Sequence, residues 1–333
     1  MTIALMVAAV LAWCWIALSC LPAGTEAHMP MPYLIALIPL LWVPLVALGA
    51  LAAWFHVWGT ACCLLAAAIA SVLRRAQYRK IGRETPHETQ ISTRETQCET
   101  ASDTLRVMTL NCRYGRADAG IIMRHIRERD IDVLALQEVT DALIVRLNEA
   151  GIRDTLPHCQ TGTPHEDDNG GYNALFSRIE PAATIPNVVD IPAAEVPAMT
   201  LGVGGRNLTV ASAHPKSPMR GCTQWSAGIR GLSALAARAR DDERDDVAVM
   251  GDLNSSIEHP SFRALLTAGL SDASLAQGAG PAPTFPSWLK WPRIELDHVL
   301  FTRGVRASDV RPLAVAGSDH LALVATLSLP HCR

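Results

Sequence analysis

The chain has 333 residues, enough for one large domain or two of ordinary size, and 49% of them are hydrophobic. Its net charge of −3 excludes a globally basic surface for nucleic acid. Its nine cysteines include no C-x-x-C pair, which disfavours a zinc ribbon or a thioredoxin-type motif.

Three uncharged apolar runs occupy residues 3–21, 32–55 and 57–73. Each is about the length of a membrane-spanning helix, roughly 20 residues. We therefore expect residues 1–75 to form a membrane anchor with three transmembrane helices, which makes the chain a multi-pass protein of the cell membrane. A cleaved signal peptide is the alternative for the first run, but that run lacks a basic n-region and two further runs follow it. Buried core helices are disfavoured because the runs have no amphipathic period.

The segment between the first two runs contains Glu26 and no Lys or Arg, whereas a basic cluster follows the third run. By the positive-inside rule, this cluster predicts that everything after it lies in the cytoplasm. The cluster consists of Arg74, Arg75, Arg79, Lys80 and Arg83.

Residues 84–103 are rich in Glu, Thr, Ser and Gln and contain almost no apolar residues. Such a composition buries too little surface to offset the conformational entropy of an ordered chain. We expect a flexible polar linker over residues 76–103 and a folded domain over residues 104–330.

From residue 105 onward, short apolar runs alternate with amphipathic segments, and Gly- and Pro-rich turns separate them. This pattern predicts an α/β domain of stacked sheets with helices outside. The expected strands cover residues 105–111, 133–136, 172–177, 198–203, 208–213, 247–250, 299–301 and 321–327. The expected helices cover residues 119–129, 141–150 and 227–240, and Gly151 is expected to cap the second of them.

Polar side chains border the expected strands with unusual regularity. Asp252 and Asn254 follow the strand at residues 247–250, and two oxygen-bearing side chains at this spacing suit an attacking water or a hard cation near a phosphate. The other residues at strand ends are Asn111, Gln137, Glu138, His214, Asp297, Ser318, Asp319 and His320.

The motifs occur in the order Leu-Asn, Gln-Glu, Gly-Tyr-Asn-Ala-Leu-Phe-Ser-Arg, Ala-His-Pro, Gly-Asp-Leu-Asn, Leu-Asp-His-Val-Leu and Ser-Asp-His. This order resembles the endonuclease/exonuclease/phosphatase superfamily, in particular its deoxyribonuclease and sphingomyelinase branches and its membrane-anchored bacterial members. The resemblance covers about residues 104–330. It implies a four-layer α/β/β/α sandwich with the site at one rim of the sheets, and hydrolysis of phosphate esters with Mg²⁺ or Mn²⁺.

The resemblance also implies the metal ligands. Glu138 matches the principal ligand, Asn111 matches the amide that supports the metal, and Asp319 is expected to be an acid on the metal side. A carboxylate suits a hard divalent ion that keeps most of its waters. In isolation, Glu138 would equally fit a solvated acid at a strand end, and Asn111 a turn residue.

Five further residues match catalytic positions. His320 would contact the phosphate, and Asp297 would orient it through a hydrogen bond that favours the imidazolium. Asp252 would position or deprotonate the attacking water, and Asn254 would hold a phosphate oxygen. His214 is a candidate for protonating the leaving oxygen, with a turn histidine before a proline as the alternative.

Asn173 matches an amide of the phosphate pocket, and the cations Lys216 and Arg220 are candidates for binding the substrate phosphate or for a solvated loop. The remaining histidines are expected to have no role in the site. We expect His298, the neighbour of Asp297 on a strand, to be structural, and His125, His158, His165 and His259 to lie at the surface.

Residues 104–333 contain 23 Lys and Arg and 26 Asp and Glu. This near-neutral balance weighs against a non-specific nuclease, which needs several cations to bind the nucleic-acid backbone. Trp288 and Trp291 lie in a Pro-rich segment just before Asp297 and fit either a bilayer surface or a cap over the core. The leading hypothesis is a membrane-anchored, divalent-metal-dependent phosphoester hydrolase acting on a phospholipid, a lipid-linked phosphate or a similar phosphorylated small substrate. The alternatives are a membrane-bound nuclease and a non-catalytic phosphate-binding module. Resemblance places the domain outside the cell, against the charge pattern.

Overall fold

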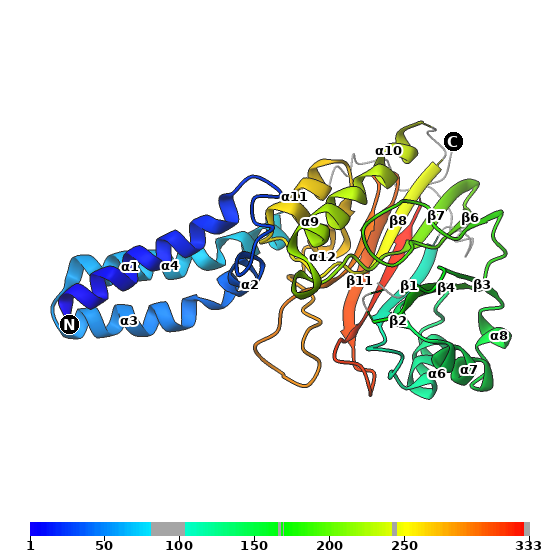
Figure 1. The fold of residues 1–333 in the computed structure, drawn as a ribbon, viewed down its shortest axis with the longest axis horizontal. Coiled ribbons are helices and arrows are strands. Elements are labelled where there is room, and N and C mark those ends of the chain that lie inside the picture. Colours follow the sequence, from blue (N-terminus) through cyan, green and yellow to red (C-terminus); the bar gives the residue numbers. More distant parts are fainter. Residues whose placement is uncertain (81–103, 166–167, 169, 242–244, 330–333) are drawn as a thin grey trace, which may run out of the picture.

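The computed structural model describes residues 1–80, 104–165, 168, 170–241 and 245–329. An amino-terminal bundle of helices adjoins a larger domain built on two sheets (Figure 1). The linker expected over residues 76–103 lies mostly outside the described residues. Its first part, however, forms the short helix α5 (Gln77–Lys80).

The bundle contains two helices long and apolar enough to cross a membrane. They are Thr2–Cys20, which comprises α1 (Thr2–Ala17) and a 3-10 turn, and Trp58–Arg79, which begins with α4 (Trp58–Leu73). The second apolar run is not one straight helix. It consists of Met31–Leu40 and Trp42–Trp54, bent by 65° and containing α2 (Met31–Leu37) and α3 (Trp42–Trp54). Pro39 lies just before the bend, where its missing N–H interrupts the helical hydrogen bonds.

The larger domain has two mixed six-stranded sheets, with strand orders β11-β12-β1-β2-β4-β3 and β5-β6-β7-β8-β10-β9. The first sheet contains β1 (Thr104–Asn111), β2 (Val133–Val139), β3 (His158–Thr161), β4 (Tyr172–Ser177), β11 (Arg306–Leu313) and β12 (Ala322–Ser328). The second contains β5 (Ala183–Ile185), β6 (Ala198–Val203), β7 (Arg206–Ser212), β8 (Asp245–Asp252), β9 (Ser271–Asp272) and β10 (Asp297–Phe301).

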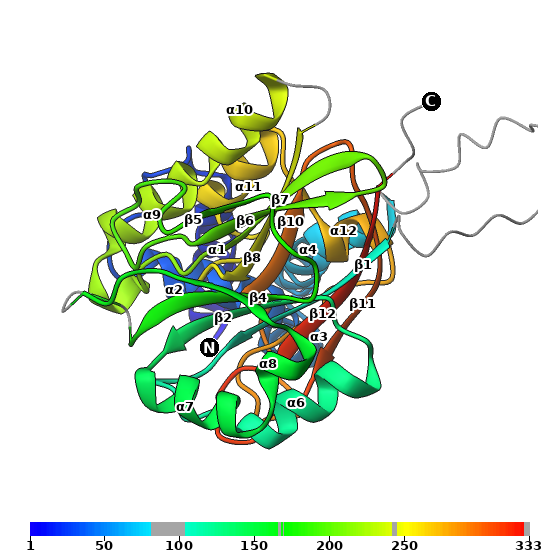
Figure 2. The same cartoon turned by 90° about the vertical axis from the view of Figure 1, so that its right-hand side faces the viewer.

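Helices cover the outer face of each sheet, as Figure 2 shows. The first sheet carries α6 (Ala119–Glu128), α7 (Asp141–Glu149) and α8 (Ile152–Thr155). The second carries α9 (Cys222–Gly231), α10 (Ser233–Asp241), α11 (Pro260–Thr267) and α12 (Ala273–Gln277). The expected sandwich of two sheets between helical layers is therefore confirmed.

The alternation of side chains along β1 explains the layering. Leu105 and Val107 belong to the core between the sheets, together with Val210 and Met250 of the second sheet. Met108 and Leu110, whose side chains point to the opposite face, pack under the helices of the first sheet. From Val107 onward both faces of this central strand are buried, so the run Val107–Met108 and Leu110 contribute apolar side chains to both layers.

Two differences from the sequence expectations have local causes. The helix expected over residues 227–240 is divided into α9 and α10 at Leu232, next to Gly231, because glycine weakens a helix interior. Strand β11 was not expected, since it is a largely exposed edge strand with an irregular register between Ser308 and Arg311. Gly151 follows α7 with a φ of 86°, in the capping conformation that the sequence indicated.

Candidate active site

Glu138 reaches the rim of the sheets because β2 contains a bulge. The register between β2 and β4 shifts between Leu136 and Val139, and Glu138 has a φ of 53°. Gly170 gives this carboxylate room, since a Cβ at that position would lie 2.6 Å from Glu138 Oε2. The strand therefore continues past the end that the sequence indicated, and the bulge turns the carboxylate toward the site.

Asn111 links the two sheets at this rim. It ends β1 in the first sheet, and its Nδ2 lies 3.1 Å from Oε1 of Glu138 and 3.0 Å from Oδ2 of Asp252, which ends β8 in the second. Its Oδ1 accepts a hydrogen bond from the backbone N–H of Arg113 at 2.8 Å. The amide nitrogen of Asn111 thus lies between two carboxylates.

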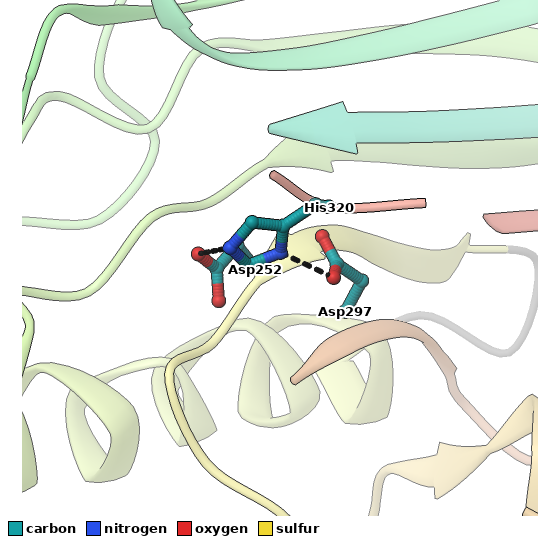
Figure 3. A group of neighbouring side chains, drawn as sticks. All are labelled: Asp252, Asp297 and His320. Carbon is teal, nitrogen blue, oxygen red and sulfur yellow. Dashed lines mark hydrogen bonds and ion pairs between the residues drawn. The ribbon is translucent and has the colours of Figure 1, made fainter. Parts of the chain in front are cut away.

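The ring of His320 lies between the carboxylates of Asp297 and Asp252 (Figure 3). Its Nδ1 lies 2.7 Å from Oδ2 of Asp297, and its Nε2 lies 3.6 Å from Oδ2 of Asp252. Asp297 and Asp252 are cross-strand partners on β10 and β8. Burial lowers the pKa of His320, but Asp297 and Asp252 outweigh it and raise the pKa to about 10. The ring is therefore an imidazolium at neutral pH.

A second imidazole lies on the other side of Asp252. His214 is fully buried, and its Nε2 lies 3.5 Å from Asp252 Oδ2 and 4.0 Å from Glu138 Oε1. Burial lowers the pKa of His214, yet Asp252 and Glu138 raise it above its ordinary value overall. Burial raises the pKa of Asp252, but the two histidines and Asn111 lower it well below its usual range. Asp252 is thus held as an anion between two imidazole rings, of which His320 is the imidazolium.

Asn254 follows β8 in a left-handed conformation, with a φ of 50°. Its backbone N–H donates to Asp252 Oδ1 at 2.8 Å, and its side chain donates to the carbonyl of Pro215 at 3.1 Å. Asp319 pairs with Arg113 at 3.5 Å. A pocket of about 220 Å³ opens over these groups and is lined by Asn111, Tyr114, Glu138, His214, Ser217, Met219, Arg220, Asp252, Asn254, Asp319 and His320.

Two expected substrate-binding residues, Asn173 and Lys216, are not among the residues that line this pocket. Asn173 is fully buried, and its Nδ2 donates to the carbonyl of Glu195 at 2.8 Å. Arg220 does line the pocket, where it donates to the hydroxyl of Tyr114 at 3.2 Å.

Sequence reasoning missed Tyr114, whose backbone N–H donates to Glu138 Oε2 at 2.8 Å. It also missed Ser217 and Met219 of the pocket wall. The Tyr-Gly pair three residues after Asn111 was a weak signal for Tyr114, because Gly115 marks a tight turn there.

His298 lies outside the site, where its ring contacts Asp272 Oδ2 and the carbonyl of Ser255, each at 2.8 Å. The expectation of surface positions is wrong for His125 and His259, which are buried. Each ring lies within hydrogen-bond distance of a backbone carbonyl from a distant segment, a contact that local sequence does not reveal. His165 is exposed, and His158 is half-buried.

The donor atoms of the site fit a divalent cation. One atom each of Asp252, Asp297 and His320 lie within 4.8 Å of one another. The two carboxylates can bind a cation directly, whereas the ring of His320 can do so only after it loses a proton. Asp297 Oδ1 is buried and has no hydrogen-bond partner among the residues that the structure describes. Glu138 and Asp319 add carboxylates in the same pocket, and such oxygen-rich sets suit hard cations.

A sequence profile of the endonuclease/exonuclease/phosphatase family matches residues 108–320. A search of curated proteins finds no match. An endonuclease/exonuclease/phosphatase from Beutenbergia cavernae is structurally similar, with a TM-score of 0.56, 22% identity and coverage of 68% of this chain and 72% of that one.

Two further similar structures are a phosphatase named for a sugar phosphate and a protein bound to a DNA product. A mannosyl-6-phosphatase from Bacteroides thetaiotaomicron gives a TM-score of 0.53 at 16% identity, covering 68% of this chain and all of its own. TDP2 from D. rerio, in complex with a single-strand DNA product, gives 0.52 at 16% identity, covering 68% of this chain and 99% of its own. At such identities the structures share the fold.

Proposed function

The chain belongs to the endonuclease/exonuclease/phosphatase family of phosphoester hydrolases, and from this premise we propose that it is a membrane-anchored, divalent-metal-dependent phosphoesterase acting on a phospholipid or lipid-linked phosphate. One observation carries the catalytic part of this proposal. Asp252 lies within 3.6 Å of His214 and His320 and receives a hydrogen bond from Asn111, which also contacts Glu138. Five separate segments from the two sheets thus converge on one small pocket.

The electrostatics assign distinct roles to these groups. With its strongly lowered pKa, Asp252 is a weak proton acceptor, so it orients the attacking water more than it deprotonates it. His320, aligned by Asp297, places positive charge against the phosphate. His214, whose pKa is raised, protonates the leaving oxygen. Asn254 supplies a hydrogen-bond donor to a phosphate oxygen.

We propose that Glu138 and Asp319 hold the cation and that Asn111 supports it by donating to Glu138 Oε1. A bound Mg²⁺ or Mn²⁺ would withdraw charge from the phosphate and lower the pKa of bound water. The carboxylates of Glu138 and Asp319 open directly into the pocket and supply the oxygen ligands.

Exposed tryptophans support a lipid substrate. Trp288 and Trp291 have relative exposures of 64% and 58%, so they do not cap the core. Their segment, which joins α12 to β10, projects from the sandwich on the side nearer the helical bundle (Figure 1, orange). Phe285 of the same segment packs on the ring of His320 with ring centres 4.9 Å apart, which connects this apolar surface to the site.

The contacts of the bundle support three membrane crossings. The loop between α1 and α2 contacts the sandwich through Glu26, and the segment after α4 contacts it through Arg74. We infer that both lie on one side of the membrane and that the bent pair crosses between them. The amino terminus then lies on the opposite side, and resemblance favours an extracytoplasmic sandwich.

The test uses the full chain in lipid nanodiscs with Mg²⁺ or Mn²⁺. We expect hydrolysis of phospholipids that stops with chelator and falls at least about a hundredfold in His320→Ala and Glu138→Ala. His158→Gln and Glu180→Gln, which alter residues outside the pocket, serve as matched controls. Wild-type activity in both site variants would remove the assignment. Faster cleavage of plasmid DNA would favour the nuclease, and phosphate binding without turnover would favour a binding module.

A further inference from the structure

The loop between α1 and α2 places a buried carboxylate on the sandwich. Glu26 is fully buried, and its Oε1 accepts a hydrogen bond from the backbone N–H of Ser261 at 2.7 Å. Ser261 is the second residue of α11, whose amino-terminal end has no side-chain cap of its own. Glu26 therefore satisfies a free N–H of this helix and places negative charge at the positive end of its dipole.

A chain of contacts leads from the anchor to the catalytic loop. His259 is buried, its Nδ1 accepts the backbone N–H of Ser256 at 2.9 Å, and its Nε2 donates to the carbonyl of Pro32 in α2, also at 2.9 Å. The ring meets Trp225 edge to face, with centres 5.2 Å apart. Trp225 Nε1 in turn donates to the carbonyl of Asn254 at 2.9 Å. The contacts with the N–H of Ser256 and the carbonyl of Asn254 therefore hold the backbone that follows Asp252.

A second connection reaches the segment of Asp297. Tyr78 of α5 is buried, and its hydroxyl donates to Oε2 of Glu295. The other oxygen of Glu295 accepts the backbone N–H of Ala282 at 2.8 Å. Glu295 lies two residues before Asp297, the partner of His320. The side chain of Tyr78 also belongs to the apolar cluster between the second sheet and its helices.

We propose that the membrane anchor and the adjoining helix α5 position the catalytic groups of the active site, with Glu26, His259 and Tyr78 as positioning residues. This inference rests on the proposed function. These contacts hold two segments of the second sheet in place. One segment carries Asp252 and Asn254, at the end of β8, and the other carries Asp297, at the start of β10. A displacement of about 1 Å at such groups can cost roughly a hundredfold in rate. A tethered domain that merely stays near the membrane would need none of these buried polar contacts.

The test compares full-length variants in nanodiscs. Glu26→Ala removes the cap on α11, and Tyr78→Phe removes one hydroxyl while it keeps the ring in the core. We expect each to lower kcat about tenfold with KM within about twofold, because substrate contacts remain. Glu26→Gln, which keeps an oxygen acceptor, should recover most of the rate. Thr25→Ala, at an exposed neighbour in the same loop, should behave as the wild type.

Two further measurements distinguish a loss of positioning from a loss of stability, and they do not depend on the choice of substrate. Amide hydrogen exchange over residues 252–259 should accelerate about tenfold in Glu26→Ala, and exchange over residues 295–297 should accelerate in Tyr78→Phe. Both readouts remain available if no phosphoester is cleaved, so failure of the proposed function is distinguishable. Unchanged kcat and unchanged exchange in both variants would overturn the proposal. So would a rate loss that matches only the fraction of unfolded protein.

Discussion

The Nδ1 atom of His320 lies 2.7 Å from Oδ2 of Asp297, although strands of different sheets position the two residues. Asp297 begins β10 in the second sheet, and His320 lies two residues before β12 of the first. The hydroxyl of Ser318 holds the His320 loop by donating to the carbonyl of Asn111 and accepting the N–H of His320. The pair therefore forms only when the two sheets stack correctly, which couples assembly of the fold to assembly of the site.

Asp297→Asn tests this pair directly, since it removes the charge and nearly preserves the shape. Without the charge, the pKa of His320 should fall from about 10 toward its ordinary range. The imidazolium would then be lost as pH rises, so we expect kcat to drop about a hundredfold at pH 8 and less at pH 6. A pH–rate profile of the variant measures this. An alkaline limb identical to that of the wild type would contradict the role of Asp297.

Glu138→Gln tests the proposed cation site. The amide keeps the size of the side chain but removes one negative charge from the pocket, so the affinity for a hard cation should fall. We expect chelator to abolish wild-type activity and added Mg²⁺ or Mn²⁺ to restore it. The variant should need at least about tenfold more metal for half-maximal activity. Titration of Mn²⁺ followed by electron paramagnetic resonance checks binding without reference to turnover.

Glu180→Gln provides the comparison for that titration, because Glu180 is an exposed acid that does not line the pocket. It should bind Mn²⁺ as the wild type does. An unchanged metal requirement in Glu138→Gln would instead favour the group of Asp252, Asp297 and His320 as the principal site.

The layers of the fold and most of the site were predictable because they depend on local patterns. The apolar run before Asp252 indicated β8, and the apolar residues over 105–111 indicated β1. Edge strands such as β11 are largely exposed and half polar, so no comparable pattern marks them.

The direction of individual side chains was not predictable, because it depends on contacts between distant segments. Asn173 lies on the expected strand, yet its amide is bound to the carbonyl of Glu195 rather than exposed in the pocket. His259 is buried, and its ring contacts the carbonyl of Pro32, which lies 227 residues earlier in the chain. Glu138 reaches the site only through a bulge that requires two glycines, Gly170 and Gly171, opposite it.

The exposed tryptophans predict a dependence on the physical state of the substrate. We expect Trp288→Ser combined with Trp291→Ser to lower hydrolysis of phospholipid in vesicles about tenfold, because two amphipathic side chains no longer enter the interface. Hydrolysis of a small soluble phosphodiester should stay within about twofold, since these residues do not line the pocket. Equal losses on both substrates would indicate damage to the site, and no loss on either would argue against contact with lipid.

His298 predicts a pH dependence of stability. Burial lowers its pKa, but Asp272 and Glu295 raise it to about 9 overall. Because the folded pKa exceeds the unfolded value, this stabilisation is complete below about pH 6.5 and is lost as pH rises through 9. The effect amounts to at most about 3 kcal/mol. Urea unfolding followed by tryptophan fluorescence at pH 6 and pH 9.5 should show this loss in the wild type and in His158→Gln. In His298→Asn the difference between the two pH values should shrink, and an equal difference would refute the assignment.

The contacts of Glu26 and Arg74 with the sandwich predict the position of the amino terminus. With three crossings, an epitope placed before residue 2 must lie on the opposite side of the membrane from the sandwich. In intact cells, only one of two antibodies, against the epitope or against the sandwich, should therefore bind, and both should bind after permeabilisation. Binding of both in intact cells would mean that the bent pair formed by Met31–Leu40 and Trp42–Trp54 does not cross. Glu26 and Arg74 could then not both reach the sandwich, and the docking of the anchor would be wrong.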